Sequence, residues 1–239
     1  MKILFLNKQK ISKNTYSFLF KKPNKFSYLP GQYLYLSLPH FKNNDYKGPT
    51  RIFTISSSPT EKNIMITTRI RKKSKFKLEL LKLKKNTTVE FEGPSGTFIL
   101  DEHEIGHHVL IAGGIGITPF RSFIKYSIDK NLPNKIDLIF SDKSKNDFPF
   151  YRELLQIKKA HKHINIYMTA TRIKNPKNWS GLTGRINSKM IKSILKNNKL
   201  NQKTYWICGP PPMVMTVEQE LLNLKIKHKN IRIENFTGY

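Results

Sequence analysis

Apolar residues in the first hundred positions of the chain occur in short runs, several of which alternate with polar residues and end at turn-forming residues. Alternation with a period of two is typical of strands that bury one face, and several such runs at this spacing predict an antiparallel β-barrel or sandwich. The predicted strands are Thr15–Lys21, Gln32–Leu38, Arg51–Ser56, Asn63–Arg71, Thr88–Glu92 and Thr97–Leu100. A helix interrupts them, because Phe76, Leu80, Leu81 and Leu83 recur near helical spacing.

From His107 onward, continuous apolar runs alternate with helix-like stretches, which predicts a parallel sheet flanked by helices on both faces. The predicted strands are Val109–Ala112, Ile136–Phe140, Ile164–Met168, Thr204–Cys208 and Ile231–Ile233. The predicted helices are Pro119–Lys130, Phe148–Ala160, Ser188–Lys196 and Pro212–Leu224. We therefore predict two domains, residues 1–102 and 103–239, with the division within Asp101–Gly106.

The composition is that of a folded globular protein, since 38% of the residues are hydrophobic and 11% are aromatic. The N-terminal apolar run ends at Asn7 and lysines follow, which does not fit the core of a signal peptide. No later stretch approaches the ~18 apolar residues that a membrane-spanning helix needs. We expect a cytoplasmic monomer without a membrane span.

The formal net charge of +27 is extreme, and 35 of the 43 basic residues are lysines. A positive field of this kind can steer an acidic partner such as a small redox protein or a nucleic acid. The 20 asparagines and many isoleucines that accompany the lysines favour a compositional bias and a solvated lysine surface instead. Zinc-finger spacing, basic recognition helices and ribonucleoprotein motifs are all missing from the sequence, so nucleic-acid binding is not expected.

The chain has one cysteine, Cys208, which excludes an internal disulfide and an iron–sulfur cluster held by cysteines of this chain alone. The seven histidines form no recognisable metal-ligand cluster in the sequence, so no metal site is expected. Any one-electron chemistry would therefore need an organic cofactor or a separate carrier.

A strand that begins at His108 runs into Gly113, Gly114 and Gly116, and Thr118 and Pro119 then suit the cap and first turn of a helix. Glycines let the backbone approach a pyrophosphate, and the free N–H groups of a helix N-terminus attract its charge. A tight strand-to-helix turn without a ligand is the alternative. Three glycines together with a suitable cap favour ligand binding, although the spacing differs from the usual GxGxxG.

Two further segments, Arg51–Ser57 and Cys208–Met213, contain candidate ligand contacts. In Arg51–Ser57, alternation puts Arg51 and Phe53 on one face of a strand, where an arginine can clamp a phosphate and an aromatic ring can cover a planar ligand. Taken alone, this segment is better explained as an ordinary amphipathic strand with an edge arginine. In Cys208–Met213, a glycine and three prolines fix a rigid turn from strand to helix. Packing or ligand contact is favoured for Cys208 over nucleophilic catalysis, because no histidine or second cysteine is near it in sequence.

Together, these segments resemble the ferredoxin–NADP reductase family over nearly the whole chain. The resemblance rests on five landmarks in the same order: Leu29–Tyr33, the Arg51, Phe53 and Thr54 strand, Gly93–Phe98, Gly113–Pro119 and Cys208–Pro210. It implies an FAD-binding β-barrel followed by an NAD(P)-binding α/β domain.

The resemblance also implies residue roles in the first domain. Arg51 would hold the FAD pyrophosphate, Phe53 would pack on the flavin, and Thr54 would form a hydrogen bond near flavin N5. Other expected FAD contacts are Thr67 and Arg69 on the next strand and Ser74, Phe76 and Lys77 at a helix start. This sequence departs from the family pattern in two places, because the segment Arg71–Leu80 lacks the glycine that many members carry there and a phenylalanine at 53 replaces the commoner tyrosine.

In the second domain, the resemblance assigns dinucleotide contacts to Gly113, Gly114, Gly116, Thr118, Cys208, Gly209 and Pro210. Glu234 would position the nicotinamide or relay a proton, and Phe236 or Tyr239 would cover the flavin face. An edge strand with a frayed tail is the alternative for this C-terminal segment. Thr171 and Arg172, assisted by Lys143 and Lys174, resemble the residues that meet the 2′-phosphate of NADP(H); a solvent-facing arginine is the alternative, and NAD(H) is a possible substitute.

The implied catalytic groups are therefore Thr54, Cys208, Glu234 and Phe236. The implied reaction moves a hydride between NADP(H) and FAD and single electrons between FAD and a separate acidic carrier, such as ferredoxin or flavodoxin. Rival interpretations are a reductase that serves an oxygenase, a cytochrome, or free flavin or quinone, and a non-catalytic flavin-binding redox sensor.

Overall fold

A computed structural model describes residues 1–38, 41, 48–173, 179–196 and 199–236 of the chain. Contacts between residues divide the chain into two compact units. The first unit comprises Met1–Asp101 together with Thr118–Lys130, and the second comprises Glu102–Ile117 together with Asn131–Tyr239. Residues 118–130 therefore belong to the N-terminal unit by their contacts, although they follow the first segment of the second unit along the chain.

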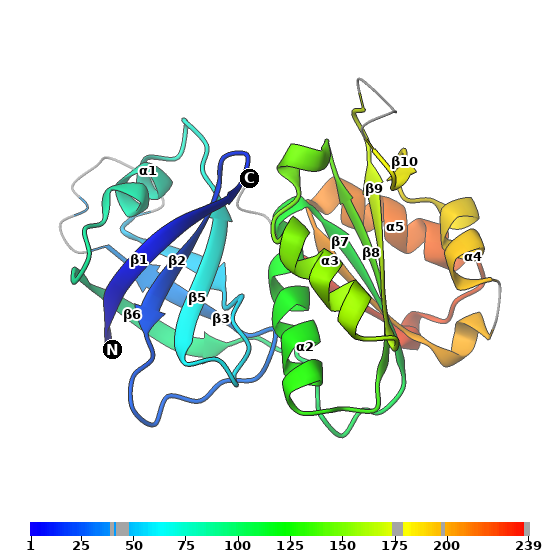
Figure 1. The fold of residues 1–239 in the computed structure, drawn as a ribbon, viewed down its shortest axis with the longest axis horizontal. Coiled ribbons are helices and arrows are strands. Elements are labelled where there is room, and N and C mark those ends of the chain that lie inside the picture. Colours follow the sequence, from blue (N-terminus) through cyan, green and yellow to red (C-terminus); the bar gives the residue numbers. More distant parts are fainter. Residues whose placement is uncertain (39–40, 42–47, 174–178, 197–198, 237–239) are drawn as a thin grey trace. The chain divides into compact units, whose positions relative to one another are not determined.

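The first unit is built on six antiparallel strands (Figure 1). They are β1 (Lys2–Ser12), β2 (Thr15–Lys21), β3 (Tyr33–Ser37), β4 (Thr50–Thr54), β5 (Asn63–Arg69) and β6 (Thr88–Ser95), in the order β4-β3-β6-β1-β2-β5. A bridge between Ile55 and Ile66 joins the end of β4 to β5 and so closes the sheet on itself. The predicted antiparallel barrel is confirmed.

In the first unit, one predicted strand is wrong and one strand was missed; the two-residue strand Leu182–Thr183 of the second unit was not predicted either. Residues Thr97–Leu100 form no strand, because the chain leaves the sheet after β6. Phe98 instead packs against Phe120 and Phe123 at 5.9 Å between ring centroids, so its burial comes from a helix and not from strand pairing. The strand that was missed is β1, which buries Ile3 and Phe5 to 2% and 1% exposure while its later lysines face solvent.

The barrel interior is filled by large apolar side chains, and Phe5, Phe18, Phe20, Leu34 and Leu36 are all buried there. The predicted helix is present as α1 (Lys75–Lys82). It packs Phe76 and Leu80 into the same core, both fully buried. Because Ser74 accepts a hydrogen bond from the backbone N–H of Lys77, the start of α1 has a serine cap.

Helix α2 (Ile117–Asp129) packs against the barrel through its aromatic face. Gly31 makes this close packing possible: it has φ +99°, and a Cβ there would lie 2.1 Å from the carbonyl oxygen of Phe98 and 2.5 Å from the Phe123 ring. A side chain at position 31 would therefore separate the helix from the barrel.

The second unit is a parallel six-stranded sheet in the order β10-β9-β8-β7-β11-β12, which confirms the predicted α/β architecture. Its strands are β7 (His107–Gly113), β8 (Lys135–Asp142), β9 (Ile164–Ala170), β10 (Leu182–Thr183), β11 (Thr204–Gly209) and β12 (Ile231–Asn235). Its helices are α3 (Tyr151–Ala160), α4 (Ser188–Leu195) and α5 (Pro211–Asn223), with short 3₁₀ segments η1 (Gly114–Gly116), η2 (Lys145–Asp147), η4 (Leu200–Gln202) and η5 (His228–Asn230).

The core of this unit lies between the sheet and its helices. Figure 1 shows α3 on one face of the sheet and α5 on the other. Ile191 of α4 and Val217 of α5 bury against Val109, Ile139 and Ile207 of the three central strands. Among the described residues, no helix is long and apolar enough to cross a membrane.

Candidate functional site

The carboxyl ends of the parallel strands bring together segments that are far apart in the sequence. Gly113 at the end of β7 is paired with Ser141 of β8, and Ala112 is paired with Cys208 of β11. Cys208 is in turn paired with Glu234 of β12. Ligands of open α/β sheets bind outside this edge, at the point where the strand order reverses. That reversal lies here between β7 and β11, because β8 and β9 extend the sheet on one side and β12 on the other.

The glycines at this edge are required by close packing, against backbone atoms at Gly116 and against the Met213 side chain at Gly113 and Gly209. A Cβ on Gly116 would lie 2.2 Å from the carbonyl oxygen of Cys208 and 2.7 Å from the backbone nitrogen of Gly209. A Cβ on Gly113 would lie 2.3 Å from Sδ of Met213, and a Cβ on Gly209 would lie 3.2 Å from Cα of Gly113. The glycine loop and the turn after β11 therefore pack directly on one another, while Gly114 supplies a positive φ of 56°.

Thr118 does not cap the helix as expected. The 3₁₀ turn of Gly114–Gly116 leads directly into α2, which begins at Ile117, so Thr118 is already in the first helical turn. The N–H of Ile117 donates to Gly114 and Ile115, and the helix therefore starts earlier than the sequence indicated. Thr118 is buried at 2% exposure.

Cys208 is fully buried. Burial, and then the nearby carboxyl group of Glu234, raise the pKa of the Cys208 thiol well above its ordinary value. Because the thiolate is the nucleophilic form, this environment opposes covalent catalysis by Cys208. The burial of Cys208 agrees with the role in packing or ligand contact that the sequence favours.

The C-terminal strand is joined to the turn after β11 by the backbone. The N–H of Phe236 donates to the carbonyl oxygen of Gly209 at 3.1 Å, which holds the Phe236 backbone beside Pro210. Burial raises the pKa of the Glu234 carboxyl group, so it takes up a proton more readily than an exposed glutamate. Tyr239, the other residue predicted to cover the flavin, lies outside the described residues.

Thr171 and Arg172 follow β9 at the same edge of the sheet. Their backbone N–H groups donate to the carbonyl oxygens of Asp142 at 2.9 Å and Lys143 at 2.7 Å. The side chains of Thr171, Arg172 and Lys143 are all exposed. The cationic groups of Arg172 and Lys143 therefore face solvent at this edge of the sheet. They lie two strands from the glycine loop, a separation of roughly 10 Å. Lys174 lies outside the described residues.

In the first unit, three of the predicted FAD residues lie together. The Arg51 guanidinium lies 5.0 Å from the ring centroid of Phe76, and the Phe53 ring lies 6.0 Å from the same ring. Arg51 also donates to the carbonyl oxygens of Gly48 and Thr50 at 2.8 and 2.7 Å. Phe53 and Phe76 are part of the barrel core, so Phe53 presents only 6% of its surface.

The start of α1 lies beside Arg51, because Phe76 is the second residue of that helix. Its first turn carries no acidic residue and contains Lys75 and Lys77. Two lysines, an arginine and a helix N-terminus form a positively charged region suited to a pyrophosphate. These residues fit the diphosphate of FAD even though the expected glycine is missing.

The other predicted FAD residues differ in their surroundings. Thr67 is buried at 4% exposure, and its hydroxyl exchanges hydrogen bonds with Ser56 at 2.8 Å and Ser17 at 2.9 Å. Its side chain is therefore engaged in the barrel wall. Arg69 donates from Nε to the Thr15 hydroxyl at 3.4 Å. Thr54 is paired with Tyr33 and is 9% exposed.

Comparison with known proteins identifies both units. A family model described as "Oxidoreductase FAD-binding domain" matches residues 2–100, and one described as "Oxidoreductase NAD-binding domain" matches residues 110–219. Sulfhydrogenase 1 subunit gamma of Pyrococcus furiosus is 31% identical over 90% of this chain and 71% of its own length. A ferredoxin NADP+ reductase from Neisseria gonorrhoeae, solved with FAD and NADP, has the same fold, with a TM-score of 0.79 and 21% identity over 98% of each chain.

The chain belongs to the ferredoxin–NADP reductase family. Its two domains are the FAD-binding and NAD-binding domains of this family of oxidoreductases. Flavohemoprotein A of Dictyostelium discoideum is 25% identical over 94% of this chain, but the chain spans only 57% of that protein's length.

The sequence analysis of this ferredoxin–NADP reductase family member missed one cluster, which lies at the segment after β4. Arg121 of α2 donates to both carboxylate oxygens of Glu61, at 2.8 and 3.2 Å, and to the carbonyl oxygen of Ser56 at 2.8 Å. Ser122 donates to the carbonyl oxygen of Ser57 at 2.8 Å. The cluster anchors the segment after β4 to α2. A single arginine on the apolar face of the predicted helix was the available signal.

Proposed function

We propose that the chain is an FAD-dependent reductase that moves a hydride between NADP(H) and FAD and single electrons between FAD and a separate acidic carrier such as ferredoxin or flavodoxin. The observation that carries the proposal is the convergence of Gly116, Cys208 and Glu234, from three separate segments, at the carboxyl edge of one parallel sheet. We further propose residues 1–102 as the FAD-binding domain and residues 103–239 as the NADP(H)-binding domain. FAD supplies the conversion between two-electron and one-electron transfer when it is bound.

In the barrel, the proposed role of Arg51, Ser74 and Lys77 is to bind the FAD pyrophosphate. The positive region at the start of α1 supports this role. Thr54 follows Arg51 on the same strand, and its hydroxyl is proposed to donate a hydrogen bond near flavin N5. The core packing of Phe53 against Phe76 supports a positioning role for Phe53 at one side of the flavin.

In the second unit, Glu234 and Phe236 are proposed to act at the nicotinamide. The raised pKa of Glu234 supports a carboxyl group that holds and releases a proton at one of its oxygens. The hydrogen bond from the Phe236 N–H to Gly209 supports a fixed starting position for the aromatic ring. The buried Cys208 contributes shape and exclusion of water rather than a nucleophile.

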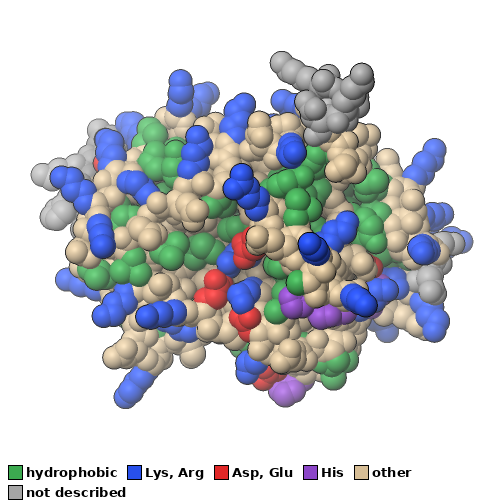
Figure 2. All heavy atoms as spheres, in the orientation of Figure 1, with side chains coloured by type: hydrophobic (Ala, Val, Ile, Leu, Met, Phe, Trp, Pro, Cys, Tyr) green, Lys and Arg blue, Asp and Glu red, His purple; other side chains and the backbone are tan. Residues whose placement is uncertain are grey.

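The surface charge supports an acidic carrier. Figure 2 shows Lys and Arg side chains spread over the visible face, with few Asp and Glu side chains among them. A field from a net charge of +27 accelerates encounter with an acidic protein, and salt screens it. We expect reduction of an acidic ferredoxin or flavodoxin to slow as ionic strength rises.

The function is tested by adding NADPH to the FAD-loaded protein without oxygen, and then adding candidate acceptors in parallel. We expect loss of the visible flavin absorbance, followed by rapid reoxidation by ferredoxin or flavodoxin. An unchanged spectrum with both NADPH and NADH would contradict the reductase and favour a redox sensor. Faster reoxidation by a cytochrome, quinone or free flavin would replace the proposed carrier with that acceptor.

The preference for NADPH is expected to depend on Arg172. Replacing Arg172 with alanine removes a charge-assisted contact to the 2′-phosphate, which we expect to lower the NADPH-over-NADH ratio of kcat/KM about 10- to 100-fold. The matched control is Lys159→Ala, an exposed cation at the end of α3, which should leave the ratio unchanged. The assignment of NADP(H) fails if Arg172→Ala keeps the parental ratio.

A further inference from the structure

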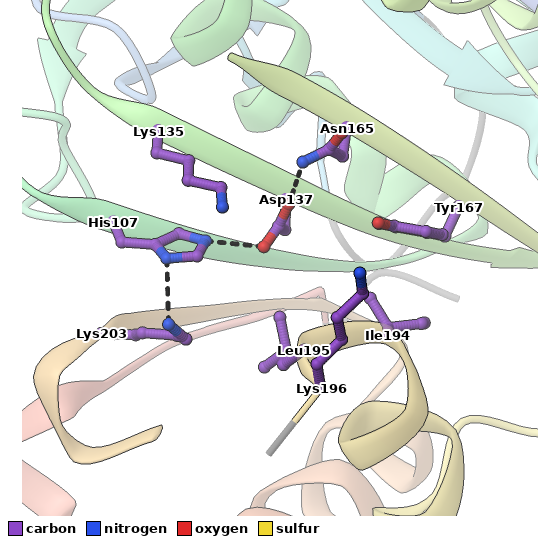
Figure 3. A pocket seen from close by; sticks show the side chains of 9 residues that line it. All are labelled: His107, Lys135, Asp137, Asn165, Tyr167, Ile194, Leu195, Lys196 and Lys203. Carbon is purple, nitrogen blue, oxygen red and sulfur yellow. Dashed lines mark hydrogen bonds and ion pairs between the residues drawn. The ribbon is translucent and has the colours of Figure 1, made fainter. Parts of the chain in front are cut away.

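The parallel sheet carries a cavity of about 280 Å³ at its amino edge (Figure 3). His107 and Lys135 line it from the first positions of β7 and β8, and Lys203 lines it just before β11. Asp137 lies five residues before the carboxyl end of β8, which is roughly 16 Å of extended chain. The cavity is therefore separate from the edge where Gly116 and Arg172 lie.

A chain of hydrogen bonds organises the wall of this cavity (Figure 3). Lys203 donates from Nζ to Nδ1 of His107 at 3.0 Å, and Nε2 of His107 lies 2.6 Å from Oδ2 of Asp137. Asn165 donates to Oδ1 of the same carboxylate at 2.7 Å. An ammonium group has no acceptor, so Nδ1 of His107 must accept and Nε2 must carry the proton that is donated to Asp137. The two contacts fix the orientation of the His107 ring.

The cavity has more positive than negative charge. Burial alone would raise the pKa of Asp137, but hydrogen bonds from His107 and Asn165 outweigh it and hold the pKa below its ordinary value. The carboxylate is therefore charged, and both of its oxygens already have donors. Three lysines, Lys135, Lys196 and Lys203, line the same space, so their charge exceeds that of the one carboxylate.

Lys203 is the least exposed of the three lysines, so water contributes least to the solvation of its ammonium group. It is 8% exposed, and burial, together with nearby lysines, lowers its pKa. Within the described residues, the hydrogen bond from its ammonium group to His107 is the one that the structure shows, which leaves two of the three N–H donors for a ligand. An anion in the cavity would supply the missing partner.

We propose that this cavity binds the phosphoryl dianion of a small phosphomonoester. Three ammonium groups around one space match the three terminal oxygens of a phosphoryl group, and lysine binds phosphate as a point charge. The volume exceeds that of the phosphoryl group, and the Tyr167 ring and the Ile194 side chain line it as well. They offer a less polar wall for the organic part of the ligand. The Asp137 carboxylate holds His107, and His107 in turn accepts a hydrogen bond from Lys203, so the carboxylate helps to position this lysine. The three lysines outnumber the one carboxylate that would repel the ligand.

The proposal is tested on the full-length, FAD-loaded protein by titration with inorganic phosphate and with glycerol phosphate, followed by NMR of the His107 ring protons. We expect a saturable shift with both probes. Lys196→Gln removes one exposed cation of the cavity and should weaken binding about tenfold or more. Lys203→Met should weaken it further if that variant folds, whereas Lys196→Gln alone is sufficient for the test.

Two control variants separate this cavity from other anion sites. Lys189→Gln removes an exposed lysine of α4, the helix that ends just before Lys196, at about 10 Å along the helix axis, and should leave the affinity unchanged. Arg172→Ala, at the carboxyl edge, should do the same. The proposal is overturned by a shift that does not saturate, by equal weakening in Lys189→Gln, or by tighter binding of succinate than of phosphate.

Discussion

Replacing Gly116 with alanine is expected to lower the rate of flavin reduction by NADPH about 100-fold or more, because it displaces the glycine loop by about 1 Å. The added Cβ would lie 2.2 Å from the carbonyl oxygen of Cys208 and 2.5 Å from its carbonyl carbon. Both neighbours are backbone atoms of a central strand, so no side chain can move to relieve the overlap. Either the loop shifts or β7 and β11 separate.

The structural cost of this overlap is about 1–3 kcal/mol, as for other overpacked interiors, so the variant should remain folded. We expect its FAD content to match that of the parent, because the proposed FAD residues belong to the first unit. Stopped-flow measurement of flavin reduction without oxygen therefore reports the dinucleotide site rather than loss of the flavin.

The matched control is Gly106→Ala, in the loop before β7. A Cβ at Gly106 meets nothing within 4 Å, so the same substitution should leave the rate of flavin reduction within about twofold of the parent. If Gly116→Ala reduces flavin at the parental rate, the tight contact between the glycine loop and the turn after β11 does not position the dinucleotide. Equal damage in both variants would point to general destabilisation.

Replacing Arg121 with methionine is expected to destabilise the first unit by about 2–4 kcal/mol, since it leaves the Glu61 carboxylate without its cationic partner. The side chains of Arg121 and Glu61 are 9% and 26% exposed, so solvent compensates only in part for the lost contact. The carbonyl oxygen of Ser56 loses a donor in the same substitution. Glu61 keeps its hydrogen bond from the N–H of Ser58.

Hydrogen exchange of the α2 amides measures this loss locally, and urea unfolding measures it for the unit. The pair is isolated by a double-mutant cycle with Glu61→Gln, which should show a coupling energy of about 1–3 kcal/mol. Lys125→Met is the control on the same helix, where a partly exposed pair with Asp129 should contribute only about 0.3–0.5 kcal/mol. Additive effects of Arg121→Met and Glu61→Gln would mean that their ion pair does not anchor α2.

Local patterning was sufficient for most of the elements. The period-two runs predicted β2 at its observed bounds, and the continuous apolar runs predicted the five long strands of the parallel sheet. The helix at Phe76 was found because a helical face repeats within a few residues. The errors among the strands have different causes: β1 was missed because only its first half carries buried apolar residues, β10 because it has only two residues, and Thr97–Leu100 was misassigned because a helix covers Phe98. A pattern of burial reports that side chains are covered, but it does not report whether a strand or a helix covers them.

Some features of the candidate site were likewise predicted from the sequence, and others are explained only by the structure. The glycines, the Arg51 strand and the turn after Cys208 were visible because each is a local segment with unusual residues. The parallel register predicts that their ends meet, and the structure adds why Gly116 must lack a side chain. The capping role of Thr118 was wrong, because a 3₁₀ turn before it changes where the helix begins.

The sequence by itself determined the order of strands and helices, the two kinds of sheet and the family, since these follow from periodicity and from short motifs. Only the tertiary structure decided that α2 packs with the barrel, that Arg121 meets Glu61, and that three lysines converge around Asp137. Each of these joins residues that are distant along the chain and unremarkable alone. Their proximity depends on how whole elements pack, and no local pattern of residues encodes that packing.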